Sequence, residues 1–184
     1  MGSAPAHHRI YPPVLKTLEA TARMATQQHC GGVATVAMDY TLAALKVFAS
    51  QLADSTEAPS SEGSSTAQKL FGIHYQRVWI QGVILSAKYQ ESGDGNLVLD
   101  DGSCVIDLFV APKEAESRFW RAGMYVMVVG AYIAPKSEDS YPAIKVHKIV
   151  DLSSQPHREA MWYMEVAEAY NLFYLPSLLA SFSS

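Results

Sequence analysis

The chain has 184 residues, of which 49% are hydrophobic and 17% are charged, and its formal net charge is −4. This length allows one ordinary domain with tails, and the hydrophobic content suffices for a core. The small excess of acid gives no general attraction to nucleic acid or to an anionic membrane. The two cysteines, Cys30 and Cys104, are far apart, so no disulfide framework is expected and a reducing compartment is favoured. No apolar run is long enough for a membrane-spanning helix.

Three segments precede the main body of the chain. Residues 1–37 are rich in Ala, Thr, Gln and His without a sustained period, which predicts a disordered tail. Their low acid content leaves a transit peptide as an alternative. Residues 38–52 predict an amphipathic helix, because leucines recur at three- and four-residue spacing after Asp39, a possible N-cap. Residues 53–74, rich in Ser, Thr, Pro, Gly and Glu, predict a flexible linker or loop.

Residues 75–153 predict five β-strands with a short helix between the third and the fourth. "RVWIQGVIL" and "MYVMVVGAYI" carry Gly82 and Gly130 in their middles, where a strand bulges or bends. "NLVLDDGSCVIDLFV" predicts a hairpin around Asp101-Gly102, a dipeptide that suits a type I′ turn. This order favours a mainly β fold: a five-stranded OB-fold barrel with an N-terminal helix and a C-terminal interface helix.

Residues 154–175 predict a long C-terminal helix, with Ser154 as a possible cap, Pro156 in its first turn and Pro176 just after its end. Residues 176–184 are then a tail. The helix carries two apolar stripes. One consists of Trp162, Val166, Ala169, Tyr170 and Phe173, and much of the other consists of Met161, Met164, Leu172 and Leu175. One stripe can pack on the barrel, whereas the second has no internal partner. A wide stripe can be core alone, but the aromatic and Met content favours docking on another chain.

No catalytic or cofactor-binding motif is present in the sequence. The six histidines show no H-E-x-x-H or paired metal spacing, and neither a P-loop nor a G-x-S-x-G elbow occurs. The acidic residues Asp94, Asp100, Asp101 and Asp107 lack the spacing of an EF-hand loop and are expected on a solvated hairpin rim. We therefore expect no enzyme activity, no metal and no cofactor.

Single-stranded DNA binding is the main alternative function for such a barrel. It requires a basic groove and aromatic stacking platforms. The loops "KYQESGDG" and "PKSEDSYP" are instead acidic, and carboxylates beside phosphates lose the gain from counterion release. Candidate stacking residues are Tyr89, Phe109, Tyr132 and Tyr141. Direct nucleic-acid binding is therefore not expected, and a single-stranded DNA-binding OB-fold module stays as the alternative.

Several stretches together resemble one known family. "VWIQGVIL", "GMYVMVVGAY" and above all "HKIVDLSSQPHREAMWYMEV" are similar to the second, small subunit of the RecQ-mediated genome instability (RMI) complex. "LAALKVFASQL" resembles the leucine-lysine helix near that family's N-terminus. The resemblance covers roughly residues 42–52 and 77–170. The tail before Met38 and the residues after Leu175 have no counterpart in it.

The resemblance implies a non-catalytic OB-fold scaffold subunit in the nucleus. Its partners would be the C-terminal OB domain of the larger RMI subunit, topoisomerase III and a Bloom-type RecQ helicase. That assembly dissolves double Holliday junctions, suppresses crossovers and maintains genome stability. A motif of the Fanconi anaemia group M helicase would dock in a groove beside Lys148 and Trp162, and Lys46 would support contact with the wider complex. The expected partner-binding residues are Lys46, Lys148, Trp162, Val166, Tyr170 and Phe173.

Overall fold

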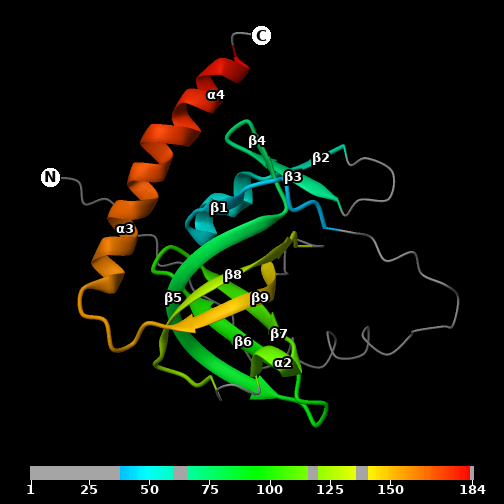
Figure 1. The fold of residues 1–184 in the computed structure, drawn as a ribbon, viewed down its shortest axis with the longest axis vertical. Helices are drawn as coiled ribbons and strands as arrows, with labels where there is room; N and C mark the ends of the chain where they lie inside the picture. The colour runs from blue at the N-terminus through cyan, green and yellow to red at the C-terminus, as the bar shows by residue number, and fades with distance from the viewer. Residues whose placement is uncertain (1–37, 60–65, 116–119, 136–140, 183–184) are drawn as a thin grey trace, which may run out of the picture. The chain divides into compact units, whose positions relative to one another are not determined.

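The computed structural model describes residues 38–59, 66–115, 120–135 and 141–182. The predicted tail 1–37 lies outside these residues. Five strands, mostly antiparallel, form one sheet (Figure 1). The sheet closes into a barrel because its first strand pairs with both the second and the fourth. The five are β5 (Arg77–Tyr89), β6 (Gly95–Asp100), β7 (Val105–Val110), β8 (Tyr125–Ile133) and β9 (Ala143–Asp151). The short helix α2 (Pro112–Ala115) follows the third, as expected of an OB fold.

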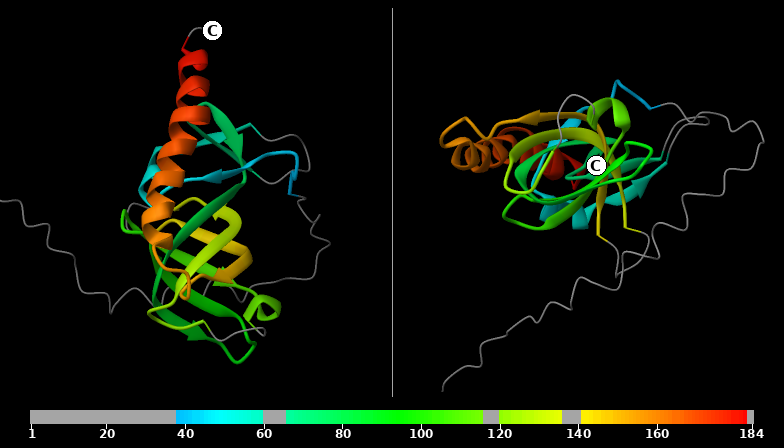
Figure 2. Two further views of the ribbon diagram at one scale, coloured as in Figure 1. Left: turned by 60° about the vertical axis from the view of Figure 1, so that its left-hand side comes forward. Right: turned by 90° about the horizontal axis from the view of Figure 1, so that it is seen from below.

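The barrel core follows from alternation along each strand. Inward positions carry Val, Ile or Leu, and outward positions carry polar or half-exposed residues. Val78 and Ile80 of β5, for example, are fully buried, as are Leu99 and Ile106 on the next two strands. Figure 2 shows the strands curving round this core. The structure confirms the five-stranded barrel that was predicted from the sequence.

The glycines within β5 and β8 mark places where two backbones approach closely. A Cβ atom on Gly82 would overlap the carbonyl oxygen of Asp100, and one on Gly130 would overlap that of Lys145. A β-bulge shifts the register between Val129 and Gly130, as expected of a strand that must bend to close a barrel. The predicted bends are thus explained by sheet closure.

The hairpin between β6 and β7 differs from the two-residue turn that was predicted. Asp100 pairs with Val105, so the loop has four residues, and Gly102 has a φ of 82°. The buried carboxylate of Asp101 accepts hydrogen bonds from the backbone of Ala49, Ser103 and Cys104 and from the hydroxyl of Ser103, at 2.6–3.0 Å. Asp101 is therefore a structural acceptor, not a solvated rim charge.

The helix predicted over residues 38–52 is wrong. Strand β1 (Ala44–Lys46) runs parallel to β5, and a 3₁₀ helix, η1 (Ala49–Asp54), follows it. Leu45, Val47 and Ala49 are buried alternately, which is a strand period. β5 extends beyond β6 and offers its free edge to this segment, so strand pairing outweighs the weak helical pattern.

The flexible linker predicted over residues 53–74 is also wrong where the structure describes it. Three short strands form a second sheet: β2 (Thr56–Ala58), β3 (Ala67–Leu70) and β4 (Ile73–Tyr75). Residues 60–65 lie outside the described residues. Leu70 and Tyr75 are buried in the main core, and the Tyr75 hydroxyl bonds the Ser55 hydroxyl at 2.7 Å. A few large side chains suffice to order a segment whose overall composition is polar.

The C-terminal helix has different ends from those predicted. α3 (Arg158–Ala169) begins after His157, which has a φ of 62°, and Ser154 does not cap it. The helix then passes through a π-helical segment, η2 (Tyr170–Tyr174), into α4 (Leu175–Ser181), so residues 176–182 are not a separate tail. Pro176 lacks an N–H and clashes with an α-helical carbonyl one turn earlier. The wider π turn before it removes that conflict, and the helix continues.

Candidate partner-binding interface

One face of α3 packs on the outside of the barrel. Trp162 and Val166 are each 1% exposed. The ring of Trp162 lies against that of Trp79 on β5, with centroids 6.4 Å apart. The first apolar stripe of the helix therefore packs within the chain.

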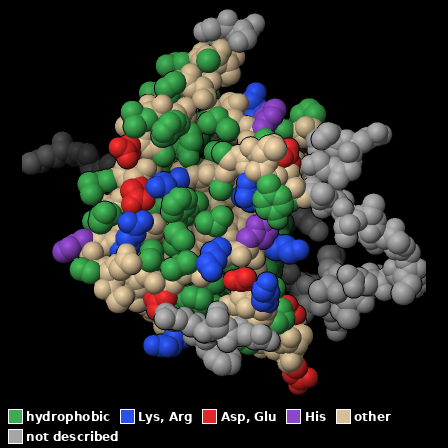
Figure 3. All heavy atoms as spheres, viewed as in Figure 1, with side chains coloured by type: hydrophobic (Ala, Val, Ile, Leu, Met, Phe, Trp, Pro, Cys, Tyr) green, Lys and Arg blue, Asp and Glu red, His purple; other side chains and the backbone are tan. Residues whose placement is uncertain are grey.

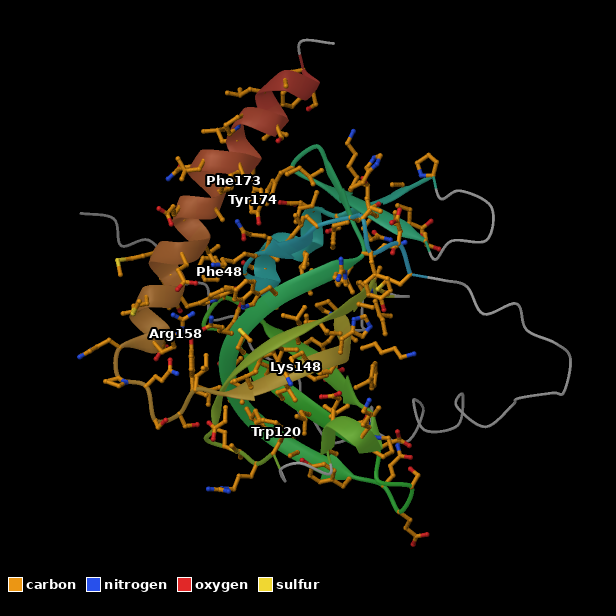
Figure 4. The ribbon with its side chains drawn as sticks, viewed as in Figure 1. Phe48, Trp120, Lys148, Arg158, Phe173 and Tyr174 are labelled. Atoms are coloured by element: carbon orange, nitrogen blue, oxygen red, sulfur yellow. The ribbon has the colours of Figure 1, made fainter. Side chains whose placement is uncertain are left out.

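A row of side chains crosses four strands beneath this contact. Lys46 pairs with Trp79, Trp79 with Val129, and Val129 with Lys148. Directly paired residues project to the same face of a sheet, so all four lie on the outer surface of the barrel. Lys46 contacts Glu165 of α3. Lys148 is exposed on β9 (Figure 4). The two predicted lysines thus occupy opposite ends of one row.

Ion pairs and a cation–π contact hold α3 against this row of side chains. The Lys46 ammonium lies 4.5 Å from the centre of the Trp79 ring and 2.9 Å from the Glu165 carboxylate. Arg158 contacts the same carboxylate at 2.9 Å. Burial acts to raise the pKa of Glu165, but the hydrogen bond and charge of Lys46, together with Arg158, outweigh it and lower that pKa. Lys46 therefore positions α3 from a strand, not from the helix that was predicted.

Replacing Lys46 by methionine should lower the free energy of unfolding by about 1 kcal/mol at neutral pH. The methionine stem still covers Trp79, but the charge is lost. Because the pKa of Glu165 is depressed in the folded chain, its contribution is present above the unfolded pKa and is lost as pH falls through the folded pKa. The difference in melting temperature, about 2–4 °C, should therefore shrink in acid. Lys148→Met is the matched control, and an equal loss in both variants would contradict the ion pair.

The contact between α3 and β5 contains buried donors without acceptors. Among the described residues, the indole nitrogens of Trp79 and Trp162 and the amide nitrogen of Gln81 have no hydrogen-bond partner. The amide oxygen of Gln81 accepts a bond of 3.2 Å from Arg158. Buried donors are normally paired, and unpaired ones cost stability. These unpaired donors therefore lower the stability of the contact between α3 and β5.

The opposite face of the helix is apolar and exposed. Met164 and Leu172 are 64% and 60% exposed, and Phe182 is 79% exposed. Hydrophobic side chains extend along the helix in the space-filling view (Figure 3). We call this surface the outer stripe; its exposed members are Met161, Met164, Leu172, Leu179 and Phe182. Monomeric proteins rarely expose such a continuous apolar surface, so the outer stripe is a candidate interface.

The six predicted partner-binding residues fall into three groups. Lys148 and Phe173 are exposed and accessible to a partner. Lys46 and Tyr170 are half-buried and engaged within the chain, Tyr170 by an edge contact with Phe71 at 5.3 Å. Trp162 and Val166 are buried against the barrel within this chain, and their role in partner binding stays a prediction. Both pack inward because the barrel offers them a hydrophobic surface.

The accessible members of the outer stripe were only partly foreseen. The three- and four-residue spacing already placed Met161, Met164 and Leu172 on a second stripe. Leu179 and Phe182 were missed, because Pro176 is an ordinary helix stop and the π turn that accommodates it has no clear sequence signal.

The surface of the barrel offers little support for nucleic-acid stacking. The Tyr89 hydroxyl donates to the Trp120 carbonyl at 2.9 Å, and the Tyr132 ring packs on Tyr75 at 5.9 Å, so both serve the fold. Asp107 lies on the third barrel strand opposite Val98, and burial raises its pKa. Tyr141 is exposed. The alternative of a DNA-binding module gains no support from these positions.

The described part of the chain contains neither a candidate metal cluster nor a candidate membrane-spanning helix. Within it, no three His, Cys, Asp or Glu side chains are grouped so that they could hold a metal ion. No helix there is both long enough and apolar enough to span a bilayer.

Comparison with known proteins identifies relatives of the whole barrel. The sequence model of the family described as RecQ-mediated genome instability protein 2 matches residues 43–170. The protein of that name from Gallus gallus is 34% identical over 96 residues, which cover 52% of this chain and 66% of the chicken protein. The Mus musculus protein of that name is 32% identical over 129 residues, covering 68% of this chain and 81% of the mouse protein.

Solved structures agree with this assignment at the level of the fold. The S. pombe Stn1–Ten1 complex contains a chain with a TM-score of 0.57 and 19% identity, covering 72% of this chain and 95% of that one. A chain of a replication protein A heterotrimer bound to single-stranded DNA has a TM-score of 0.55 and 16% identity. The match covers 70% of this chain and 96% of that one. Together with the family match, these likenesses identify the chain as a non-catalytic OB-fold protein that belongs to the RecQ-mediated genome instability protein 2 family.

Proposed function

We propose that the chain is a scaffold subunit that pairs, through the outer stripe of its C-terminal helix, with the C-terminal OB domain of the larger RMI subunit. The observation that carries the proposal is the exposed apolar surface on a helix whose other face is already packed on the barrel. Interfaces are typically anchored by such aromatic and methionine side chains. Helix-on-helix packing would remove the stripe from water.

The pair would in turn support a complex of topoisomerase III with a Bloom-type RecQ helicase. In this role the chain contributes to double Holliday junction dissolution, crossover suppression and genome stability, and it works in the nucleus. Membership of a family named for RecQ-mediated genome instability supports this proposal. The barrel serves as a rigid platform, and the chemistry belongs to the partners.

A motif of the Fanconi anaemia group M helicase is proposed to dock beside the row that ends in Lys148. The exposed Lys148 side chain supports this site. An extended peptide can supply a carboxylate, which matches this cation.

The double variant Met161→Glu, Met164→Glu tests the pairing. We expect it to bind the larger subunit about 30-fold more weakly, because hot-spot side chains typically contribute 2 kcal/mol or more. The measurement is the Kd of the full chain for the immobilised C-terminal OB domain of the larger subunit. Leu85→Glu is the matched control, since Leu85 is an exposed leucine on β5 outside both helices.

Equal affinity of the double variant and the wild type would refute docking through the outer stripe. A fluorescence anisotropy titration with single-stranded DNA at low salt distinguishes the alternative function. Micromolar or tighter binding by the isolated chain, weakening steeply with added salt, would favour a DNA-binding module over a scaffold.

A further inference from the structure

An aromatic contact holds the C-terminal helix where α3 passes into α4. The turn between β3 and β4 consists of Phe71 and Gly72, both with positive φ, at 53° and 79°. Phenylalanine rarely adopts this conformation. Its ring stacks on that of Tyr174 at 5.5 Å and meets Tyr170 edge-on at 5.3 Å. The unfavourable backbone of Phe71 is thus compensated by contacts with the π-helical segment η2.

The same segment is tied to the barrel from a second side. The Tyr174 hydroxyl accepts a hydrogen bond from the backbone N–H of Lys46 at 2.9 Å and donates to its carbonyl at 3.0 Å. Gly72 also lies against α4, because a Cβ atom there would be 3.1 Å from the carbonyl oxygen of Ser177. We call Phe71, Gly72, Tyr170 and Tyr174 the hairpin clamp. It fixes the direction of α4 relative to the barrel.

The helix that the clamp holds is apolar on its outer side. The exposed large apolar side chains on this side are Met161 and Met164 on α3, Leu172 on η2, and Leu179 and Phe182 at the end of α4. Glu168, which is also exposed, stands between Met164 and Leu172 in the sequence. Residues 171–182 contain no charged side chain. The family match ends at residue 170, so it does not account for α4.

We propose that α4, fixed by the hairpin clamp, is the second half of the docking surface, and that one helix of the partner lies along the outer stripe from Met161 to Phe182. This inference rests on the proposed function and extends it. The partner helix presents an uncharged apolar face to α4 and a Lys or Arg to Glu168. Binding to a surface that is already ordered costs less conformational entropy. The hairpin clamp should therefore strengthen partner binding.

The charge of Glu168 in the outer stripe argues against a second copy of this chain as the partner. Arg158 is the one basic residue between positions 158 and 182, and it already pairs with Glu165. Two copies of the stripe would therefore bury Glu168 without a cation, which is costly. An anionic membrane surface fits no better, because helices that lie on such surfaces carry Lys and Arg along their polar side. A partner helix with a basic residue satisfies both the apolar positions and Glu168.

Three variants of the full chain test this, using the same Kd measurement against the C-terminal OB domain of the larger subunit. Leu179→Glu, Phe182→Glu should weaken binding at least about tenfold, because it places charge in the apolar half of the stripe. Glu168→Lys should also weaken it, by like-charge repulsion. Phe71→Asn should weaken it and speed amide hydrogen exchange across residues 170–182. Asparagine suits the left-handed turn but lacks the ring, and Phe71→Tyr should retain wild-type affinity.

The outcomes separate this inference from the proposed function. If Met161→Glu, Met164→Glu weakens binding but Leu179→Glu, Phe182→Glu does not, the partner stops at α3 and the inference is wrong. If neither double variant weakens binding, the docking face itself is wrong. Wild-type affinity of Glu168→Lys would overturn the basic contact, and wild-type affinity of Phe71→Asn would overturn the clamp.

Discussion

Gly130→Ala should lower the free energy of unfolding by at least about 3 kcal/mol, since overpacking against a backbone that cannot move costs more than a typical core insertion. The new methyl group would overlap the carbonyl oxygen of Lys145 on β9 and the side chain of Ile144. Relief requires the separation of β8 from β9, and this pairing helps to close the barrel. The measurement is the urea midpoint followed by far-UV circular dichroism.

Gly123→Ala is the control for the loss of a glycine as such. A Cβ atom at Gly123 meets no heavy atom within 4 Å, but the backbone has a φ of 87°. Gly123→Ala should lower the free energy of unfolding by about 1–2 kcal/mol, the cost of holding a residue with a side chain in the left-handed conformation. A Gly130→Ala chain that unfolds at the wild-type urea concentration would show that β8 and β9 do not meet in the register described.

Trp162→Ala should cost about 3–5 kcal/mol, the usual range for removing a buried tryptophan. The indole fills the space between α3 and β5, where it contacts Trp79 and lies near the Lys46 ammonium. Its removal leaves a cavity and exposes Trp79. Amide hydrogen exchange should then rise in α3 more than in the barrel strands, because the helix depends on this contact and the strands do not.

Met164→Ala is the matched control on the same helix. Met164 is 64% exposed, so its truncation should change the free energy of unfolding by no more than about 0.5 kcal/mol. Partner binding should fall in both variants, but for different reasons: Trp162→Ala displaces the helix, whereas Met164→Ala removes a contact surface. Equal stability of Trp162→Ala and the wild type would mean that α3 does not rest on the barrel as described.

The barrel was predictable because its signals are local and redundant. Each strand combines β-branched residues with a period of two, and Gly82 and Gly130 mark the bends. Residues 38–52 were assigned to a helix because leucines at three- and four-residue spacing satisfy a helical pattern. Leu45 and Val47 fit a strand equally well, and the free edge of β5 decided between the two. Such a tertiary choice cannot be read from a short window.

The interface was predictable as a helix with surplus apolar surface, but the inner and outer faces were confused. Trp162 and Phe173 lie on one helical stripe by spacing, yet one is buried and the other is 63% exposed. The π turn between them rotates the later residues relative to an α-helix, so spacing alone assigns them to the wrong face. The stacking of Phe71 on Tyr174 depends on a hairpin whose polar composition concealed it.

The buried carboxylate of Asp101 has a consequence for the order of assembly. Its bonds to Ser103 and Cys104 span two or three residues and can form as soon as the β6–β7 loop closes. Its bond to Ala49 joins positions 52 residues apart. Local contacts form earlier than distant ones, so the loop presents a prepared acceptor before η1 arrives. Residues 44–54 are therefore expected to dock after this loop has closed, and every strand pair that closes the barrel can form without them.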